Sequence, residues 1–161
     1  MILKEHQEKI ELYGAGFDLL TAALAEVPSE AWKFRPAPGE WSVHEIIIHL
    51  ADSETNAALR ARKLAAEPNG TLMGYDQDVW ARDLNYHHQD PSDALQLVKY
   101  ARLTTYNWIK TLPDKAFGSS VRHPEYEEPY TFEMWLNIYS GHILGHIEQI
   151  KNNVKIWKGQ K

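Results

Sequence analysis

The sequence predicts an all-α protein, a four-helix bundle with long connecting loops. Four segments carry apolar residues at the three-and-four spacing of amphipathic helices, which favours helices that pack side by side. Stretches rich in Pro and Gly separate these segments, and no alternating runs predict a convincing pair of strands. Because 161 residues suffice for one compact core, we expect a single domain over residues 1–161.

The first helix is expected to start near Leu3 and to end before Pro28. Gly14 and Gly16 each weaken it by about 1 kcal/mol relative to Ala, so either packing holds it together or a neighbouring backbone comes close. Its apolar positions alternate by threes and fours, which is typical of a helix packed lengthwise against others: Leu3, His6, Ile10, Tyr13, Phe17, Leu20 and Leu24.

The second helix is expected to begin at Ser42. Ser42 and Glu45 form a Ser-x-x-Glu capping box, in which each side chain satisfies a free amide at the helix start, and this role explains Glu45 better than that of a general base. Trp41 precedes the box as a hydrophobic staple. His49 flanks the apolar stripe, which consists of Val43, Ile46, Ile47, Leu50, Ala57 and Leu64.

The third helix is expected to start at Asp90 as its N-cap, with Pro91 at the first helical position, and to stop at Pro113. Residues 68–90, which precede it, are expected to be irregular, and connections of that length are usually functional or mobile. The fourth helix is expected from about Tyr130. Its apolar stripe consists of Phe132, Trp135, Leu136, Tyr139, Ile143, Ile147, Ile150 and Val154.

Two histidines lie within the stripe of the fourth helix. Four residues of α-helix turn through about 400°, so the imidazoles of His142 and His146 point the same way, toward the protein interior. One interpretation is a pair of core histidines that hydrogen-bond to their neighbours. The other is a bidentate pair for a divalent transition metal, with His49 as the candidate third ligand. Since the chain has no Cys, a metal would have to be held by His, Asp or Glu.

Composition argues against several classes of protein. A net charge of −5, without clusters of Lys or Arg, argues against nucleic-acid binding. No apolar run approaches the length of a membrane span, and charged residues stand where a secretory signal would place its apolar core. We therefore expect a cytoplasmic protein without nucleic-acid or membrane partners. The sequence also lacks a Gly-rich phosphate loop, a Gly-x-Ser-x-Gly turn and a dinucleotide fingerprint.

In combination, these motifs resemble the DinB/YfiT-like superfamily of bacterial metal-binding four-helix proteins. The resemblance extends over essentially the whole chain. It is carried by Trp41-Ser42-x-x-Glu45-Ile46-x-x-His49-Leu50 and, about ninety residues later, by His142-x-x-x-His146-x-x-Gln149-Ile150. The loop segments Tyr75-Asp76-Gln77-Asp78-x-Trp80 and His123-Pro124-Glu125 fit the YfiT-like branch.

The resemblance implies a DinB-like four-helix bundle in which His49, His142 and His146 bind one divalent metal ion and leave a coordination position open to water. Members of the superfamily include proteins classed as metal-dependent hydrolases, and transferases or isomerases that use low-molecular-weight thiols. Many form dimers, so this chain is a candidate homodimer. Zn or Ni is the expected ion, and Fe, Mn, Co and Cu are further candidates.

We therefore expect an enzyme that acts on a small molecule. It would either hydrolyse its substrate with a metal-activated water or transfer a low-molecular-weight thiol to an electrophile. The alternative is a non-catalytic metal-binding or stress-related binding protein, in which the metal stabilises the bundle.

Candidate substrate-pocket residues are Tyr75, Trp80, His123 and Tyr139. Two simpler interpretations stay open, an exposed loop position for His123 and core packing for Tyr139. A peptide-like thiol would also need cationic groups for its carboxylates. These could come from Arg35, Arg60, Arg82 or Arg122, but only if the side chain points at the metal.

Overall fold

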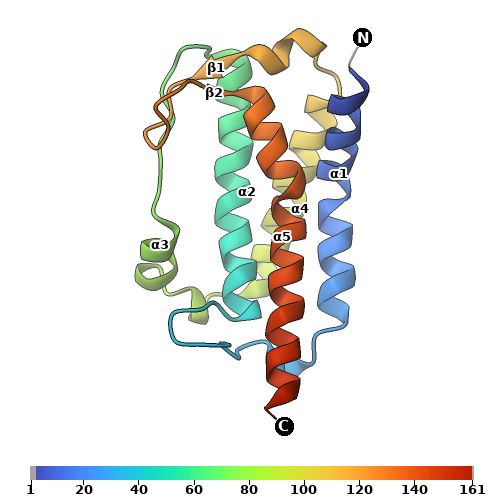
Figure 1. The fold of residues 1–161 in the computed structure, drawn as a ribbon, viewed down its shortest axis with the longest axis vertical. Coiled ribbons are helices and arrows are strands. Elements are labelled where there is room, and N and C mark those ends of the chain that lie inside the picture. Colours follow the sequence, from blue (N-terminus) through green and yellow to red (C-terminus); the bar gives the residue numbers. More distant parts are fainter. Residues whose placement is uncertain (1–2, 161) are drawn as a thin grey trace.

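Four long helices form a bundle in the computed structural model (Figure 1). The structure describes residues 3–160, so Met1, Ile2 and Lys161, the ends of the expected domain, lie outside the described residues. The predicted all-α four-helix bundle is confirmed. The bounds of the four helices are α1 Lys4–Ala25, α2 Val43–Ala66, α4 Pro91–Ile109 and α5 Phe132–Gly159.

Two of these helices begin at the predicted caps. At the start of α2, the Ser42 hydroxyl accepts a hydrogen bond from the Glu45 backbone N–H at 3.2 Å, and the Ser42 backbone N–H donates to the Glu45 carboxylate at 2.9 Å. At the start of α4, the Asp90 carboxylate accepts from the Ser92 backbone N–H at 2.7 Å, and Pro91 is the first helical residue. Both starts were predictable because a cap is a local interaction.

Residues 68–90 are not irregular throughout, contrary to the prediction. They contain helix α3, Gln77–Asp83, which stands beside α2 and apart from the bundle (Figure 1). The Asp76 carboxylate caps α3 by accepting from the backbone N–H groups of Asp78 and Val79, each at 3.0 Å. A seven-residue helix is too short to show a periodic apolar stripe, so the pattern could not predict it.

A small strand pair, which the sequence did not predict, lies beside the bundle. Strands β1, Ser120–Val121, and β2, Tyr130–Thr131, pair antiparallel, and an isolated bridge joins Thr71 to Arg122. Two residues per strand are too few for an alternating pattern to appear in the sequence. Short 3-10 turns complete the described elements at Ser29–Ala31, Tyr86–His88 and Asp114–Gly118.

Apolar packing fixes the part of α2 that carries His49 against the part of α5 that carries the other two candidate ligands. Ile46 and Leu50 of α2 belong to one buried cluster with Ile143 and Ile147 of α5. Because these residues alternate with the histidines along both helices, the packing that buries them also turns the histidines toward one another.

A buried ion pair connects all four long helices. Arg102 of α4 pairs with Glu54 of α2, and their side chains are 1% and 0% exposed. Arg102 also donates to the backbone carbonyls of Tyr13 in α1 at 2.6 Å and Tyr139 in α5 at 2.8 Å. A Cβ at Gly16 would lie 2.8 Å from Arg102 Nε. The close neighbour that requires a glycine at position 16 is therefore the Arg102 side chain and not the backbone of another helix.

None of the helices within residues 3–160 has the length and apolarity that crossing a membrane requires.

Candidate metal centre

Three histidines meet between α2 and α5. One imidazole nitrogen from each of His49, His142 and His146 lies within 4.8 Å of the other two. The Nε2 atoms of His142 and His146 are 3.3 Å apart. The ring centroid of His49 lies 5.7 Å from that of His142 and 4.9 Å from that of His146. The structure thus brings together the three residues that the sequence singled out as ligands.

Several nitrogens of this cluster lack a protein partner. Both ring nitrogens of His49 and Nδ1 of His142 are buried without a hydrogen bond in the described part of the chain, and His49 is only 1% exposed. Leaving a buried polar group unpaired costs about 1–3 kcal/mol. The interpretation of His49 as an ordinary core histidine requires a hydrogen-bond partner, and the described residues supply none.

The separation of the nitrogens also suits a metal ion. Two imidazole nitrogens bound about 2.0–2.1 Å from a tetrahedral zinc ion stand roughly 3.3–3.4 Å apart. The Nε2 atoms of His142 and His146 have this separation already. The residues present therefore fit a divalent transition metal.

Burial keeps the three imidazoles neutral, which is the form that binds a metal. Desolvation, with a smaller contribution from His146, lowers the pKa of His49 to about 3, and desolvation likewise lowers the pKa of His142 to about 3. Burial also lowers the pKa of His146, although Gln149 opposes the shift. His146 Nδ1 donates to Gln149 Oε1 at 2.9 Å, which leaves the Nε2 lone pair facing the cluster.

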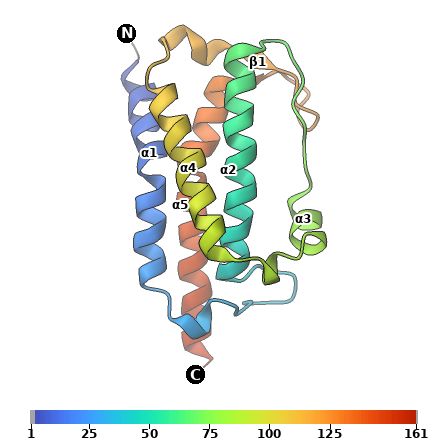
Figure 2. The same cartoon turned by 180° about the vertical axis from the view of Figure 1, so that it is seen from behind.

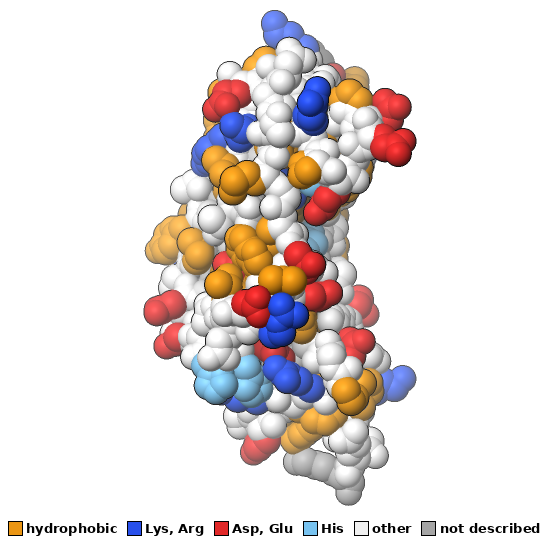
Figure 3. All heavy atoms as spheres, turned by 90° about the vertical axis from the view of Figure 1, so that its left-hand side faces the viewer, with side chains coloured by type: hydrophobic (Ala, Val, Ile, Leu, Met, Phe, Trp, Pro, Cys, Tyr) orange, Lys and Arg blue, Asp and Glu red, His pale blue; other side chains and the backbone are white. Residues whose placement is uncertain are grey.

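Two cavities reach the cluster. The larger, of about 400 Å³, is lined by His49, Ser53, Arg60, Tyr75, Asp76, Gln77, Glu125, Ile138, Tyr139 and His142. A second, of about 300 Å³, is lined by Gly39, Glu40, Trp41, Gln77, Asp78, His146 and Gln149. Gln77 of α3 lines both. The face that carries α3 shows charged side chains of both signs around its middle (Figure 3).

Of the four candidate pocket residues, Tyr75 and Tyr139 line the larger cavity. Trp80 and His123 are not among its lining residues. The Trp80 ring packs against Tyr75, with 4.5 Å between centroids. His123 is only 2% exposed and lies 5.2 Å from the Tyr130 ring, so the expected exposed loop position for His123 is wrong, because aromatic side chains cover it.

Among the four arginines considered as cationic groups, only Arg60 lines the larger cavity. Arg35 and Arg82 form ion pairs with carboxylates elsewhere, and Arg122 lines a separate cavity beside β1. From the sequence, an arginine could bind the carboxylates of a thiol only if its side chain points at the metal site. Of the four arginines, Arg60 is the one that lines the cavity next to the histidines.

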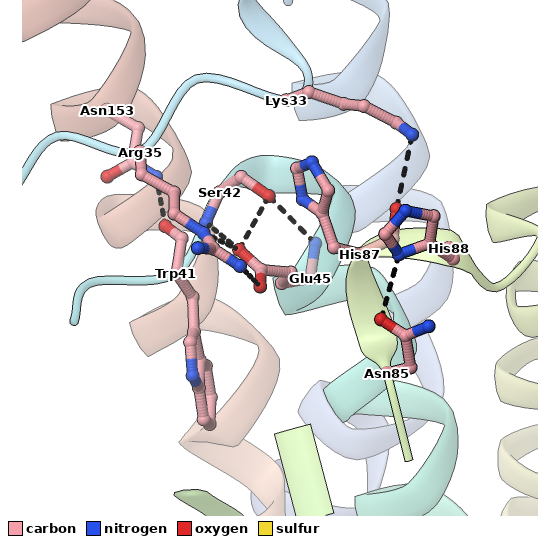
Figure 4. Close-up of polar contacts among 9 residues, drawn as sticks. All are labelled: Lys33, Arg35, Trp41, Ser42, Glu45, Asn85, His87, His88 and Asn153. Atoms are coloured by element: carbon pink, nitrogen blue, oxygen red, sulfur yellow. Dashed lines mark hydrogen bonds and ion pairs between the residues drawn. The ribbon is translucent and has the colours of Figure 1, made fainter. Parts of the chain in front are cut away.

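Glu45 is held as a helix cap, as the sequence predicted. Its carboxylate accepts hydrogen bonds from the Ser42 backbone N–H and from Arg35 Nε, both at 2.9 Å (Figure 4). Burial opposes ionisation of Glu45, but the hydrogen bonds from Arg35 and Ser42 outweigh it and lower the pKa. Asn153 of α5 donates to the Trp41 carbonyl at 2.8 Å, which ties the segment before α2 to α5 (Figure 4).

Sequence reasoning did not single out Ser53 or Gln77 as pocket residues. Ser53 lies four residues after His49 on α2, so helical spacing alone could have predicted that both side chains face the same way. Gln77 faces the cavities because α3 forms, and no pattern predicted α3.

The chain is similar to proteins of known family. A family model described as the DinB superfamily matches residues 13–150. The chain is 30% identical over 112 residues to YfiT of Bacillus subtilis, whose provisional name is metal-dependent hydrolase, and the match covers 70% of this chain but only 63% of that protein. It is 27% identical over 137 residues to a Bacillus licheniformis protein with the same provisional name, covering 85% and 78% of the two chains.

The fold is also similar to a solved structure. That structure is YfiT from Bacillus subtilis, described provisionally as a metal-dependent hydrolase with an unusual four-helix bundle topology. The TM-score is 0.86 at 26% sequence identity, and the match covers 96% of this chain and 89% of the other.

Proposed function

Because the chain belongs to the DinB superfamily, we propose that it is a metal-dependent enzyme acting on a small polar molecule in the larger cavity. The observation that carries the proposal is that three neutral imidazoles converge where that cavity ends, with His49 and His142 in its wall. A structural zinc site is usually closed by four protein ligands. Within residues 3–160, the cluster contains no fourth His, Asp or Glu.

His49, His142 and His146 would hold the ion. A divalent ion supplies Lewis acidity there and lowers the pKa of a water or thiol. Gln149 fixes the ring of His146 through Nδ1. Burial raises the pKa of Tyr139, whose hydroxyl accepts a hydrogen bond from Arg60 Nη1 at 3.2 Å. The Tyr139 proton therefore remains available to a bound molecule.

Hydrolysis is the reaction we propose first. The provisional names of the relatives support it, and within residues 3–160 neither ring nitrogen of His49 is hydrogen-bonded to the Ser53 hydroxyl in the same wall. The Asp76 carboxylate in the wall is engaged at the start of α3. Activation of a water would therefore depend on the three-histidine site.

Transfer of a low-molecular-weight thiol is the second candidate, and the second cavity favours it. A transfer reaction brings two organic molecules to one centre, whereas hydrolysis needs one organic molecule and water. The cavity of about 300 Å³ adjoins His146, and the cavity of about 400 Å³ adjoins His49 and His142. Gln77 lies in the wall of both, so the two cavities adjoin and would place two reactants beside the same three histidines.

Chelation tests the proposal. We expect EDTA to abolish turnover of an ester probe, or conjugation of a thiol to an electrophilic probe, and to change the melting temperature little. Activity should return when Zn²⁺ or Ni²⁺ is added. A large fall in melting temperature, with no turnover of either probe by the metal-loaded protein, would instead support the alternative in which the metal only stabilises the bundle.

A further inference from the structure

We propose that Arg60 determines the specificity of the larger cavity and that the molecule bound there carries a carboxylate in addition to its reacting group. This inference rests on the proposed function, because it names the substrate class of the same cavity.

Arg60 is a cation with unused hydrogen-bond donors. Nη1 donates to the Tyr139 hydroxyl at 3.2 Å and Nη2 donates to the Met73 carbonyl at 3.1 Å, and both acceptors are neutral. Nε is buried without a hydrogen bond in the described structure. A guanidinium offers five N–H donors in a planar fork that matches a carboxylate. The fold therefore holds a carboxylate-binding group at the cavity and leaves part of it unpaired.

The wall of the larger cavity also contains two carboxylates, Asp76 and Glu125. The Asp76 carboxylate accepts from two backbone N–H groups of α3 at 3.0 Å each, and Glu125 is an exposed side chain. Among the described residues the hydrogen bonds of Arg60 go to Tyr139 and Met73 and to neither of these carboxylates. Arg60 is the one Lys or Arg in the described lining of this cavity, so it is the side chain there that can pair with an anionic group.

Arg60 and His49 lie on the same face of α2. They are eleven positions apart in the sequence, and eleven steps of about 100° make three turns plus about 20°. Their Cα atoms are therefore roughly 16 Å apart along the helix axis. Side chains on a helix lean toward its N-terminus, and because the Arg60 side chain is longer than that of His49, it spans part of this separation. Ser53 lies between them in the same cavity wall.

This spacing selects the length of the ligand as well as its charge. A molecule whose reacting group lies at the histidines has to extend past Ser53 for its carboxylate to reach Arg60. A carboxylate directly beside the reacting group would be too close to the histidines. The guanidinium also lies 5.9 Å from the centroid of the Tyr75 ring, so Tyr75 and Tyr139 both border it.

The test compares ω-mercapto acids with their uncharged amides. Binding of 6-mercaptohexanoate and 6-mercaptohexanamide to zinc-loaded protein is measured by calorimetry, with 3-mercaptopropionate and its amide as the short pair. We expect wild-type protein to bind the long acid about tenfold more tightly than the long amide, as one charge-assisted hydrogen-bonded pair implies. In Arg60→Gln this ratio should fall to about one, and in wild type the short pair should show a smaller ratio.

Arg122→Gln is the matched control, because it removes an arginine that lines a different cavity. It should keep the tenfold ratio. Arg60→Lys keeps the charge without the planar fork and should retain part of the preference, which separates binding from a folding defect. Zinc content and melting temperature are measured for every variant.

If wild type binds acid and amide equally, or if Arg60→Gln keeps the preference because the carboxylate binds the zinc ion directly, the inference is wrong. If the protein turns over a probe but its preference for the acid over the amide does not depend on Arg60, this inference is contradicted and the proposed function is not. An Arg60-dependent preference in a protein that turns over no probe would support the inference and contradict the proposed function.

Discussion

At the scale of single residues, the candidate site is defined by side chains whose chemistry the fold leaves unused. His49 is almost fully buried yet neither ring nitrogen has a partner, and Arg60 Nε is buried and unpaired at the same cavity. Elsewhere among the described residues His87 Nδ1 is the one further buried side-chain nitrogen without a partner, whereas the buried Arg102 and Glu54 pair with each other. Because unpaired buried groups are costly, their concentration around one cavity indicates ligands from outside the chain.

The first prediction concerns His49. Replacement of His49 with Ala should lower the molar ratio of bound metal at neutral pH, because two imidazoles on one helix form a weaker site than three from two helices. Elemental analysis after dialysis measures the ratio. His88→Ala is the control, since His88 is exposed and bonded to Asn85, and it should bind as much metal as wild type. An unchanged ratio in His49→Ala would rule His49 out as a ligand.

Among the helices, a feature could be predicted from the sequence when the interaction that forms it joins residues close together in the chain. Ser42 and Asp90 act on amides within their own first turn, so the starts of α2 and α4 could be predicted. Arg102 could not be predicted as buried, because its partners lie on three other helices and an arginine on a helix is usually exposed.

The same rule explains what could be predicted of the site. His142 and His146 share a helix face through their spacing alone, and His49 required only that two apolar stripes pack together. Gln77 depends on a short helix capped by Asp76, and the burial of His123 depends on aromatic side chains around it. The histidines were therefore accessible to sequence reasoning, whereas most of the cavity wall was not.

The second prediction compares two glycines within long helices. Gly16→Ala should destabilise the protein, because its Cβ would lie 2.8 Å from Arg102 Nε, a side chain held by its own hydrogen bonds. Gly145→Ala meets nothing within 4 Å. It should stabilise α5 by about 0.5–1 kcal/mol, since Ala favours the helix over Gly. Urea denaturation gives both changes, and equal signs would show that the Arg102 contact does not constrain α1.

At the scale of the whole molecule, the candidate site lies on one side of the bundle. Seen from behind, α3 and its connections stand beside α2, and α1 lies at the opposite side (Figure 2). The larger cavity therefore joins α2 and α5 to the connections around α3 and around Glu125. The expected homodimer and the cytoplasmic location stay predictions.

The third prediction is acid destabilisation of the metal-free protein. Burial is the largest cause that lowers the pKa of six histidines below its ordinary value: His44, His49, His87, His123, His142 and His146. Above about pH 7.5 these imidazoles are neutral in the folded and the unfolded chain, so they contribute no pH dependence. Below it, the unfolded chain takes up protons that the folded chain resists, down to about pH 3 for His49 and His142.

The free energy of unfolding should therefore fall as the pH is lowered, by about 1.4 kcal/mol per pH unit for each additional proton that the unfolded chain binds. Urea denaturation of EDTA-treated protein between about pH 7 and pH 5 measures the slope, in a range where most carboxylates are still ionised. Because burial lowers the pKa of His49 and His142 to about 3, protons should compete with the metal in the folded protein only as the pH approaches that value, so occupancy of the folded protein should persist to pH 5. A free energy that stays constant from pH 7 to pH 5 would mean that these imidazoles accept protons in the folded chain, and the neutral cluster on which metal binding depends would not exist.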